Sequence, residues 1–130
     1  MTRKLTVSTI MFFALLCIKS PAIAENRTCI AVASEGSTAD AQISPLAARC
    51  SHFLFFNAQG EFMEALVNPH RWERRGAGPQ VVEFLSAKAI HTVIAGEFGA
   101  KMIAALKQKG MVFHTEAGTA VDAVRRIQRP

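Results

Sequence analysis

The sequence lacks the features that would divide it into several units or attach it to a membrane. Its 130 residues contain no internal repeat, low-complexity tract or linker, so one domain is expected. The longest apolar run, residues 10–18, is too short to cross a bilayer. Cysteine is scarce, with three residues in all, which excludes a disulfide-rich scaffold. Gly-x-Ser-x-Gly elbows, Walker loops and His-x-x-x-His zinc patterns are also missing, which removes the commonest catalytic signatures.

The first 24 residues have the pattern of a cleaved signal peptide. Arg3 and Lys4 precede the apolar run, and a small-x-small cleavage pattern ends at Ala24. The alternatives are an uncleaved anchor or a lipoprotein signal ending at Cys17, which has Leu16 where a small residue is wanted. We therefore expect a domain over residues 25–130 that is periplasmic or secreted and free of the membrane after cleavage.

The charge of the remaining domain is modest. Cleavage removes three basic residues and none of the ten acidic ones, so the formal net charge falls from +5 to +2. Half of the whole sequence is hydrophobic, which predicts a folded rather than a disordered chain. A small net charge does not indicate nucleic-acid binding, and any positive site is expected to be local.

Hydrophobic periodicity predicts an α/β domain with the order β-β-β-α-β-α-β-α. Strands are predicted at residues 29–35, 51–57, 61–67, 91–95 and 111–115, the second and third joined by a hairpin turn at 57–60. Helices are predicted from Pro79 with apolar positions as far as Ala89, over 100–109 up to Gly110, and along Val121, Val124 and Ile127. Together these elements predict one mixed five-stranded sheet with helices on both faces.

This topology brings four loops to one edge of the sheet, where open α/β proteins bind their ligands. The loops span residues 34–37, 70–78, 96–99 and 116–119. Three helix N-termini at that edge favour an anion, and Arg71, Arg74 and Arg75 add positive charge. The alternative for this arginine group is a solvated loop, and Trp72 either caps the site or anchors the loop.

Cys50 is expected at the same edge, and Cys29 at the opposite one. Six strand residues separate their sulfurs by about 20 Å, so an intramolecular disulfide is not expected. A free thiol at the edge is a candidate metal ligand, although cysteine is also a common buried core residue. His70 is a second candidate ligand, with a solvated side chain as the alternative. His52, His91 and His114 fit core or edge packing better.

Three stretches resemble the dinitrogenase iron-molybdenum cofactor-binding family. They are Gly-Ala-Gly-Pro from Gly76, Val-Ile-Ala-Gly-Glu-Phe-Gly ending at Gly99, and the Gly-Thr pair at Gly118. Two further segments also fit the family: Ile-Ala-Val-Ala-Ser-Glu-Gly from Ile30, at the start of the domain, and Ile-Ser-Pro from Ile43. The resemblance covers the whole mature domain. It implies a ribonuclease-H-like fold without nuclease activity, and a role in carrying or inserting metal-sulfur clusters, including mixed molybdenum-copper sulfides in orange proteins.

The resemblance also shows where this sequence departs from the family. The family usually has a His-Phe-Gly triplet before an arginine, whereas this chain has Leu46-Ala-Ala before Arg49, so a histidine suspected of contacting the cluster is missing. The exported leader is a second departure. The predicted metal ligands are Cys50 and His70. The predicted cofactor-binding residues are Ser34, Gly36, Arg49, Cys50, Arg74, Arg75, Gly76, Gly78, Gly96, Gly99, Gly118 and Thr119.

These observations predict a non-enzymatic carrier of a molybdenum- or iron-containing sulfide cluster or of an oxyanion, with a protein partner in cluster delivery. One alternative is a periplasmic interaction module that has lost the ligand. A second is a divalent-metal hydrolase that uses Glu35, Glu97 and Glu116, each of which follows a strand. Against the hydrolase, ribonuclease-H-type sites place carboxylates within the first strand, which here reads Ile-Ala-Val-Ala-Ser before Glu35.

Overall fold

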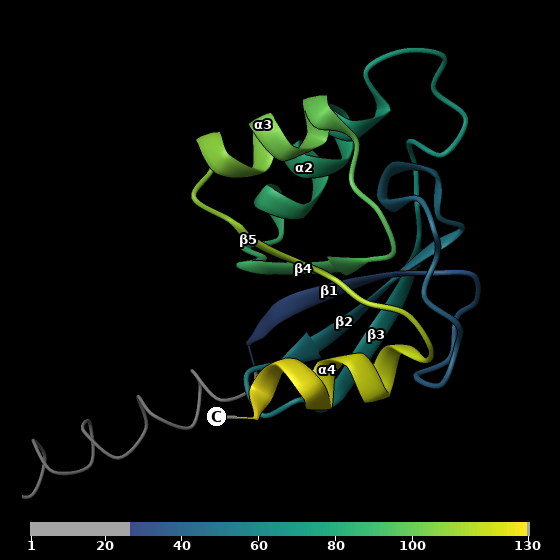
Figure 1. Ribbon diagram of the computed structural model, residues 1–130, viewed down its shortest axis with the longest axis vertical. Coiled ribbons are helices and arrows are strands. Elements are labelled where there is room, and N and C mark those ends of the chain that lie inside the picture. Colours follow the sequence, from purple (N-terminus) through teal and green to yellow (C-terminus); the bar gives the residue numbers. More distant parts are fainter. Residues whose placement is uncertain (1–26, 130) are drawn as a thin grey trace, which may run out of the picture.

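The computed structural model describes residues 27–129, in which five strands form one sheet in the order β3-β2-β1-β4-β5 (Figure 1). The predicted signal peptide, including Cys17, lies outside the described residues. The strands are β1 (Thr28–Ser34), β2 (His52–Asn57), β3 (Phe62–Val67), β4 (Thr92–Ala95) and β5 (Val112–Thr115). The helices are the 3-10 turn η1 (Ala47–Arg49), α2 (Ala77–Ala87), α3 (Ala100–Gln108) and α4 (Ala120–Gln128).

The predicted mixed sheet is confirmed. β1 runs antiparallel to β2 and β2 antiparallel to β3, whereas β1, β4 and β5 are parallel. The hairpin between β2 and β3 turns at Asn57, whose side-chain oxygen accepts hydrogen bonds from the backbone N–H groups of Gln59 and Glu61. The parallel half then follows from strand-helix-strand units, which need a crossover helix between neighbouring strands.

The alternating side chains of β2 show why helices cover both faces of the sheet. Phe53 and Phe55 are buried on the face that packs against α2 and α3, and Leu54 and Phe56 on the face that packs against α4. Because successive residues of a strand point to opposite faces, four consecutive apolar residues require cover on both sides. Figure 1 shows this arrangement, with α2 and α3 above the sheet and α4 below it. None of the described helices combines the length and apolarity needed to cross a membrane.

The ends of α2 differ from the prediction. The helix begins at Ala77 rather than Pro79, so that proline is its third residue. Proline is tolerated there because the first N–H groups of a helix have no partner within the helix. At the other end Ala89 lies beyond the helix, with φ 60°, and Ile90 is the residue that enters the core. The prediction that the helix extends to Ala89, which rested on apolar spacing, was therefore wrong.

The backbone at Ala89 predicts that Ala89→Gly stabilises the protein. The hydrogen bonds from Ala89 N–H to Ser86 and from Ile90 N–H to Leu85 form the same helix ending as at α3, where Gly110 occupies the left-handed position. Alanine costs about 1 kcal/mol there relative to glycine, because its Cβ crowds the following carbonyl. We expect the free energy of unfolding in urea to rise by about 1 kcal/mol. Unchanged or lower stability would contradict this.

The segment between β1 and β2, residues 35–50, crosses the carboxyl edge of the sheet. Ser44 N–H donates to Ala33, Gly96 N–H donates to Ser44, and Ala47 N–H donates to Glu97. Further along, Ile43 N–H donates to Gly118. The segment therefore fills the space between the end of β4 and the start of α4, and it divides the edge into two parts.

Candidate functional site

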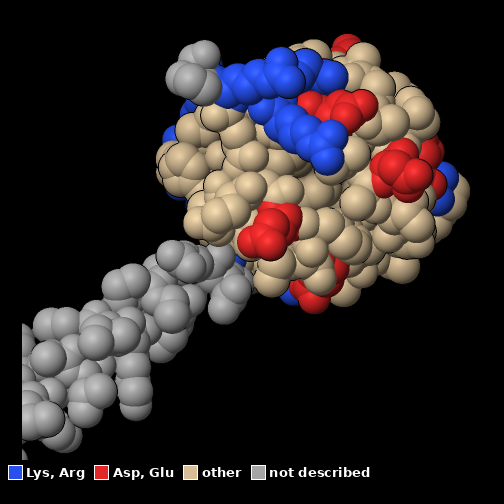
Figure 2. Space-filling view, turned by 90° about the horizontal axis from the view of Figure 1, so that it is seen from below, with Lys and Arg blue, Asp and Glu red and all other residues tan. Residues whose placement is uncertain are grey.

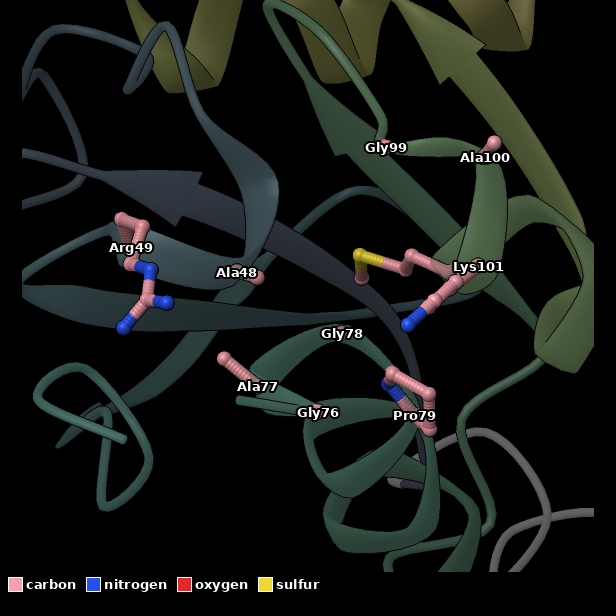
Figure 3. A pocket seen from close by; sticks show the side chains of 10 residues that line it. Ala48, Arg49, Gly76, Ala77, Gly78, Pro79, Gly99, Ala100 and Lys101 are labelled. Atoms are coloured by element: carbon pink, nitrogen blue, oxygen red, sulfur yellow. The ribbon is translucent and has the colours of Figure 1, made fainter. Parts of the chain in front are cut away.

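A hollow of about 300 Å³ lies where η1 meets the first turns of α2 and α3. Figure 3 shows Arg49 and Ala48 on one side, the start of α2 below, and the start of α3 with Lys101 on the other side. Its lining residues are Ala48, Arg49, Gly76, Ala77, Gly78, Pro79, Gly99, Ala100, Lys101 and Met102. Most of them are small, so the backbone of both helices is open to whatever enters.

Neither helix that starts at this hollow is capped. Gly76 and Gly99 are the N-cap residues of α2 and α3, and no side chain caps either helix. The N–H groups of Ala77 and Gly78 at α2 have no acceptor among the described residues, and the same holds for Ala100, Lys101 and Met102 at α3. Free N–H groups and the positive end of the helix dipole make a helix start attractive to anions. The hollow combines two such ends.

The two helix starts converge because of Gly78. A Cβ built on Gly78 would lie 2.8 Å from Cβ of Met102 and 3.3 Å from its backbone nitrogen. Any side chain at this position would force α2 and α3 apart, since real Cβ atoms do not approach so closely. The second glycine of the Gly-Ala-Gly-Pro motif thus brings the two N-termini to one hollow.

The charges around the hollow are positive. Arg49 and Lys101 line it and are both exposed, and neither α2 nor α3 has an acidic residue in its first turn. A lysine in the first turn of a helix is unfavourable for the helix dipole unless an anion compensates it. By contrast α4 carries Asp122 in its first turn. The hollow between α2 and α3 is therefore suited to a negatively charged molecule.

The structure brings together four of the predicted cofactor-binding residues: Arg49, Gly76, Gly78 and Gly99 all line the hollow. The other predicted site residues are absent from its lining, and they are Ser34, Gly36, Cys50, His70, Arg74, Arg75, Gly96, Gly118 and Thr119. Of these, Arg74 and Arg75 are exposed on the loop just before Gly76. Gly96 packs tightly on the crossing segment, since a Cβ there would lie 2.8 Å from Cα of Pro45.

The start of α4 is closed by the crossing segment. Ala120 N–H donates to the carbonyl of Ala41, and Val121 N–H donates to that of Ala39. Thr119 pairs with Gln42 in an isolated bridge. Two of the three helix N-termini expected at this edge are therefore open, and the third already has backbone acceptors. Ser34 is also buried, with its hydroxyl donating to the carbonyl of Gly36 at 2.6 Å.

Cys50 belongs to the core rather than to the hollow. It is 1 % exposed, packs in the apolar cluster between the sheet and α2, and has its sulfur 3.7 Å from Nδ2 of Asn68. Burial raises the pKa of its thiol to about 12. A protonated, buried thiol is a poor metal ligand at neutral pH, so the structure favours the core interpretation of Cys50. Cys29 and Cys50 are both free, as expected from their predicted separation.

The other candidate metal ligands do not form a cluster among the described residues. His70 is half-buried, with Nδ1 3.7 Å from Oε1 of Glu73 and its ring edge-on to Phe84. Among residues 27–129 no three histidine, cysteine, aspartate or glutamate side chains form a group that could hold a metal ion. Of the three carboxylates in the hydrolase alternative, Glu116 is paired with Arg126 at 2.7 Å. The described residues thus offer no carboxylate cluster for a hydrolytic metal.

Basic residues on the opposite face are mostly paired. Figure 2 looks at the side that carries α4, where basic side chains lie beside acidic ones. Arg126 bonds to Glu116, and Nη1 of Arg125 lies 3.7 Å from Oδ1 of Asp122. Such exposed pairs contribute little stability, but they leave less positive charge available for a polyanion.

Six lining residues were missed by the sequence reasoning: Ala48, Ala77, Pro79, Ala100, Lys101 and Met102. Two of them belong to the Gly-Ala-Gly-Pro motif, which was assigned by its glycines alone. Lys101 carries the signal that could have found the site, because it is a basic residue where a helix start normally prefers an acidic one. Met102 gave no signal, since a methionine at helical spacing normally indicates core.

Known proteins share this fold. The apo form of the orange protein from Desulfovibrio gigas is 25% identical with a TM-score of 0.72, covering 78% of this chain and 87% of that one. A putative NifB protein from Thermotoga is 26% identical with a TM-score of 0.66, covering 77% and 86%. No curated protein matches significantly. The match to the dinitrogenase iron-molybdenum cofactor family spans residues 27–129, and the chain therefore belongs to that family.

Proposed function

We propose that the protein binds and carries an anionic metal-sulfur cluster or metallate in the hollow between α2 and α3, without catalysing a reaction. The observation that carries this proposal is the pair of uncapped helix starts that share one hollow with Arg49 and Lys101. Five free N–H groups and two cations provide donors and positive charge for one anion.

The lining residues also limit what the cargo can be. None of the ten is cysteine, histidine, aspartate or glutamate, and the one sulfur among them is the thioether of Met102. A bare metal cation would find no anionic ligand and two positive charges. A complete cluster or metallate, whose metals already carry sulfide or oxide ligands, needs only hydrogen bonds and charge. The cargo is therefore held through its outer sulfur or oxygen atoms. The histidine that the family usually has, and that this chain lacks, is not needed for binding of this kind.

Location and partners form the second part of the proposal. The signal-like pattern of residues 1–24 supports export to the periplasm, or secretion, where the domain acts free of the membrane. A carrier must receive its cargo and pass it on, so a protein partner in delivery is part of the function. We do not propose nucleic acid as a partner, because the net charge after cleavage is small.

The test is retention of tetrathiomolybdate, with and without copper(I), by the purified domain under anaerobic conditions. We expect visible absorption and stoichiometric molybdenum to co-elute with the protein on gel filtration. Lys101→Glu should weaken binding at least tenfold, about 1.4 kcal/mol, because it replaces a cation beside the anion with a carboxylate.

Lys107→Glu is the matched control, since it makes the same charge change on the same helix but near its other end, and the hollow does not include it. It should bind like the parent. A parent protein that elutes free of molybdenum, or a Lys107→Glu variant as impaired as Lys101→Glu, would refute a specific site at this hollow.

An interaction module without a ligand is the second candidate. The observation in its favour is the exposure of large apolar side chains: Trp72 is 82 % exposed and Val67 68 %. Tryptophan is frequent at the energetic centres of protein interfaces. Under this alternative the domain stays colourless, and Trp72→Ala weakens association with a partner, while Lys101→Glu has no effect.

A further inference from the structure

Arg49 connects the hollow to an exposed loop. Its side chain lines the hollow, and its Nη1 donates to two carbonyl oxygens of the loop before α2, those of Arg71 at 2.9 Å and of Glu73. Among the described residues, these are the hydrogen bonds that tie residues 71–75 to a distant part of the chain. The others are local, such as that from Glu73 N–H to the carbonyl of His70.

The guanidinium of Arg49 cannot bond to the loop carbonyls and to an anion in the hollow independently. It is a rigid planar fork, so its N–H groups turn together. Nη1 is engaged by the loop, whereas Nε and Nη2 have no acceptor among the described residues. An anion in the hollow attracts these free N–H groups, and the rotation that follows redirects Nη1 away from the loop carbonyls. The bonds to the loop and to the anion therefore compete for one orientation of Arg49.

From this geometry we infer that Arg49 is a positioning residue that couples occupancy of the hollow to the conformation of residues 71–75. The inference rests on the proposed function, because it requires an anion in the hollow. The loop carries Trp72 on its surface, with the guanidinium carbon of Arg71 4.6 Å from the ring centroid. Cargo binding thus changes an exposed surface outside the lining of the hollow, and the empty and loaded forms present different loops to their surroundings.

Trp72 provides the test, because it is the one tryptophan in the sequence. In protein labelled with 5-fluorotryptophan, a single ¹⁹F resonance reports on the loop and is insensitive to the colour of the cargo. We expect tetrathiomolybdate to shift this resonance, with the same midpoint as binding measured by equilibrium dialysis. In Arg49→Gln the resonance should be displaced before any addition, and the further shift on binding should fall to less than a third of the parent value.

Arg49→Lys separates coupling from affinity. It keeps the positive charge but loses the planar fork, so the ¹⁹F shift should be lost even at tetrathiomolybdate concentrations that saturate the variant in equilibrium dialysis. Lys107→Gln is the control and should resemble the parent in both measurements. Binding without a ¹⁹F shift in the parent, or an unchanged shift in Arg49→Gln, would overturn the coupling and leave the proposed function intact. Failure of tetrathiomolybdate to bind would overturn both.

The hydrogen bonds by which Arg49 holds the loop can also be tested in the empty protein. Trypsin cleaves after arginine, and the loop contains Arg71, Arg74 and Arg75. Arg49→Gln should be cut there several-fold faster than the parent, with the sites identified by mass spectrometry. Equal rates in the two proteins would show that Arg49 does not hold the loop.

Discussion

The free energy of unfolding should fall by about 4 kcal/mol between pH 9 and pH 12, and Cys50 should account for most of the fall. Burial raises the pKa of this thiol from 9.0 to about 12 in the folded protein. Below pH 9 the thiol is protonated in both states, so its contribution is fully present. Between the two values the unfolded chain releases the proton and the folded chain keeps it, which favours unfolding by about 1.4 kcal/mol for each pH unit.

Urea unfolding at pH 7, 9, 10, 11 and 12 measures this effect. The sequence contains no tyrosine, so no phenol titrates in the same range. Cys50→Ala should lose stability at pH 7, through the small cavity it leaves, but should be much less sensitive to alkali. Cys29→Ala is the matched control, because Cys29 is less buried and its pKa is raised by the same cause. A Cys50→Ala variant as alkali-sensitive as the parent would place Cys50 outside the core.

Gly78→Ala should lower the free energy of unfolding by about 2 kcal/mol, the middle of the range for overpacking a close contact. In an ordinary helix, glycine to alanine is stabilising by up to about 1 kcal/mol, so the expected sign is reversed here. The reason is the 2.8 Å approach of the new Cβ to Cβ of Met102. The melting temperature should drop by about 10 °C, and retention of tetrathiomolybdate should be lost because the two helix starts separate.

Gly99→Ala is the stability control for this prediction. A Cβ at Gly99 meets nothing within 4 Å, and its φ of −69° suits any residue. Its melting temperature should stay within a few degrees of the parent, in line with small effects at open positions. Met102→Ala should not rescue Gly78→Ala, since the clash is with Cβ, which alanine retains. A Gly78→Ala protein as stable as the parent would mean that α2 and α3 can separate without cost.

The architecture could be predicted from the sequence because its signals are local. The aromatic run in β2, the turn at Asn57 and the glycine after α3 each specify an element, and parallel pairing follows from alternating strands and helices. Ala89 shows the limit of this reasoning. Apolar spacing alone does not distinguish a helical alanine from one held in the left-handed region by a hydrogen-bonded helix ending.

The site was predicted less completely because it depends on a segment without periodicity. Residues 35–50 have no pattern that places them across the sheet edge, yet their backbone bonds close the start of α4 and leave the starts of α2 and α3 open. The same segment places Cys50 inside the core, although its position next to β2 predicted an edge-facing thiol. Gly76, Gly78 and Gly99 were found because they belong to the stretches that resemble the family, whereas Lys101 required knowledge of where the helix begins.

The open starts of α2 and α3 imply that the lifetime of the protein depends on its load. A ligand that binds only the folded state adds about 2.7 kcal/mol of stability at one hundred times its dissociation constant. The empty form lacks this gain at two helix ends that have no caps of their own, so it should fray and be degraded there first. Installing a cap such as Gly99→Asp would protect the empty protein and repel the cargo. If the proposed function holds, the empty protein should be degraded faster than the loaded one.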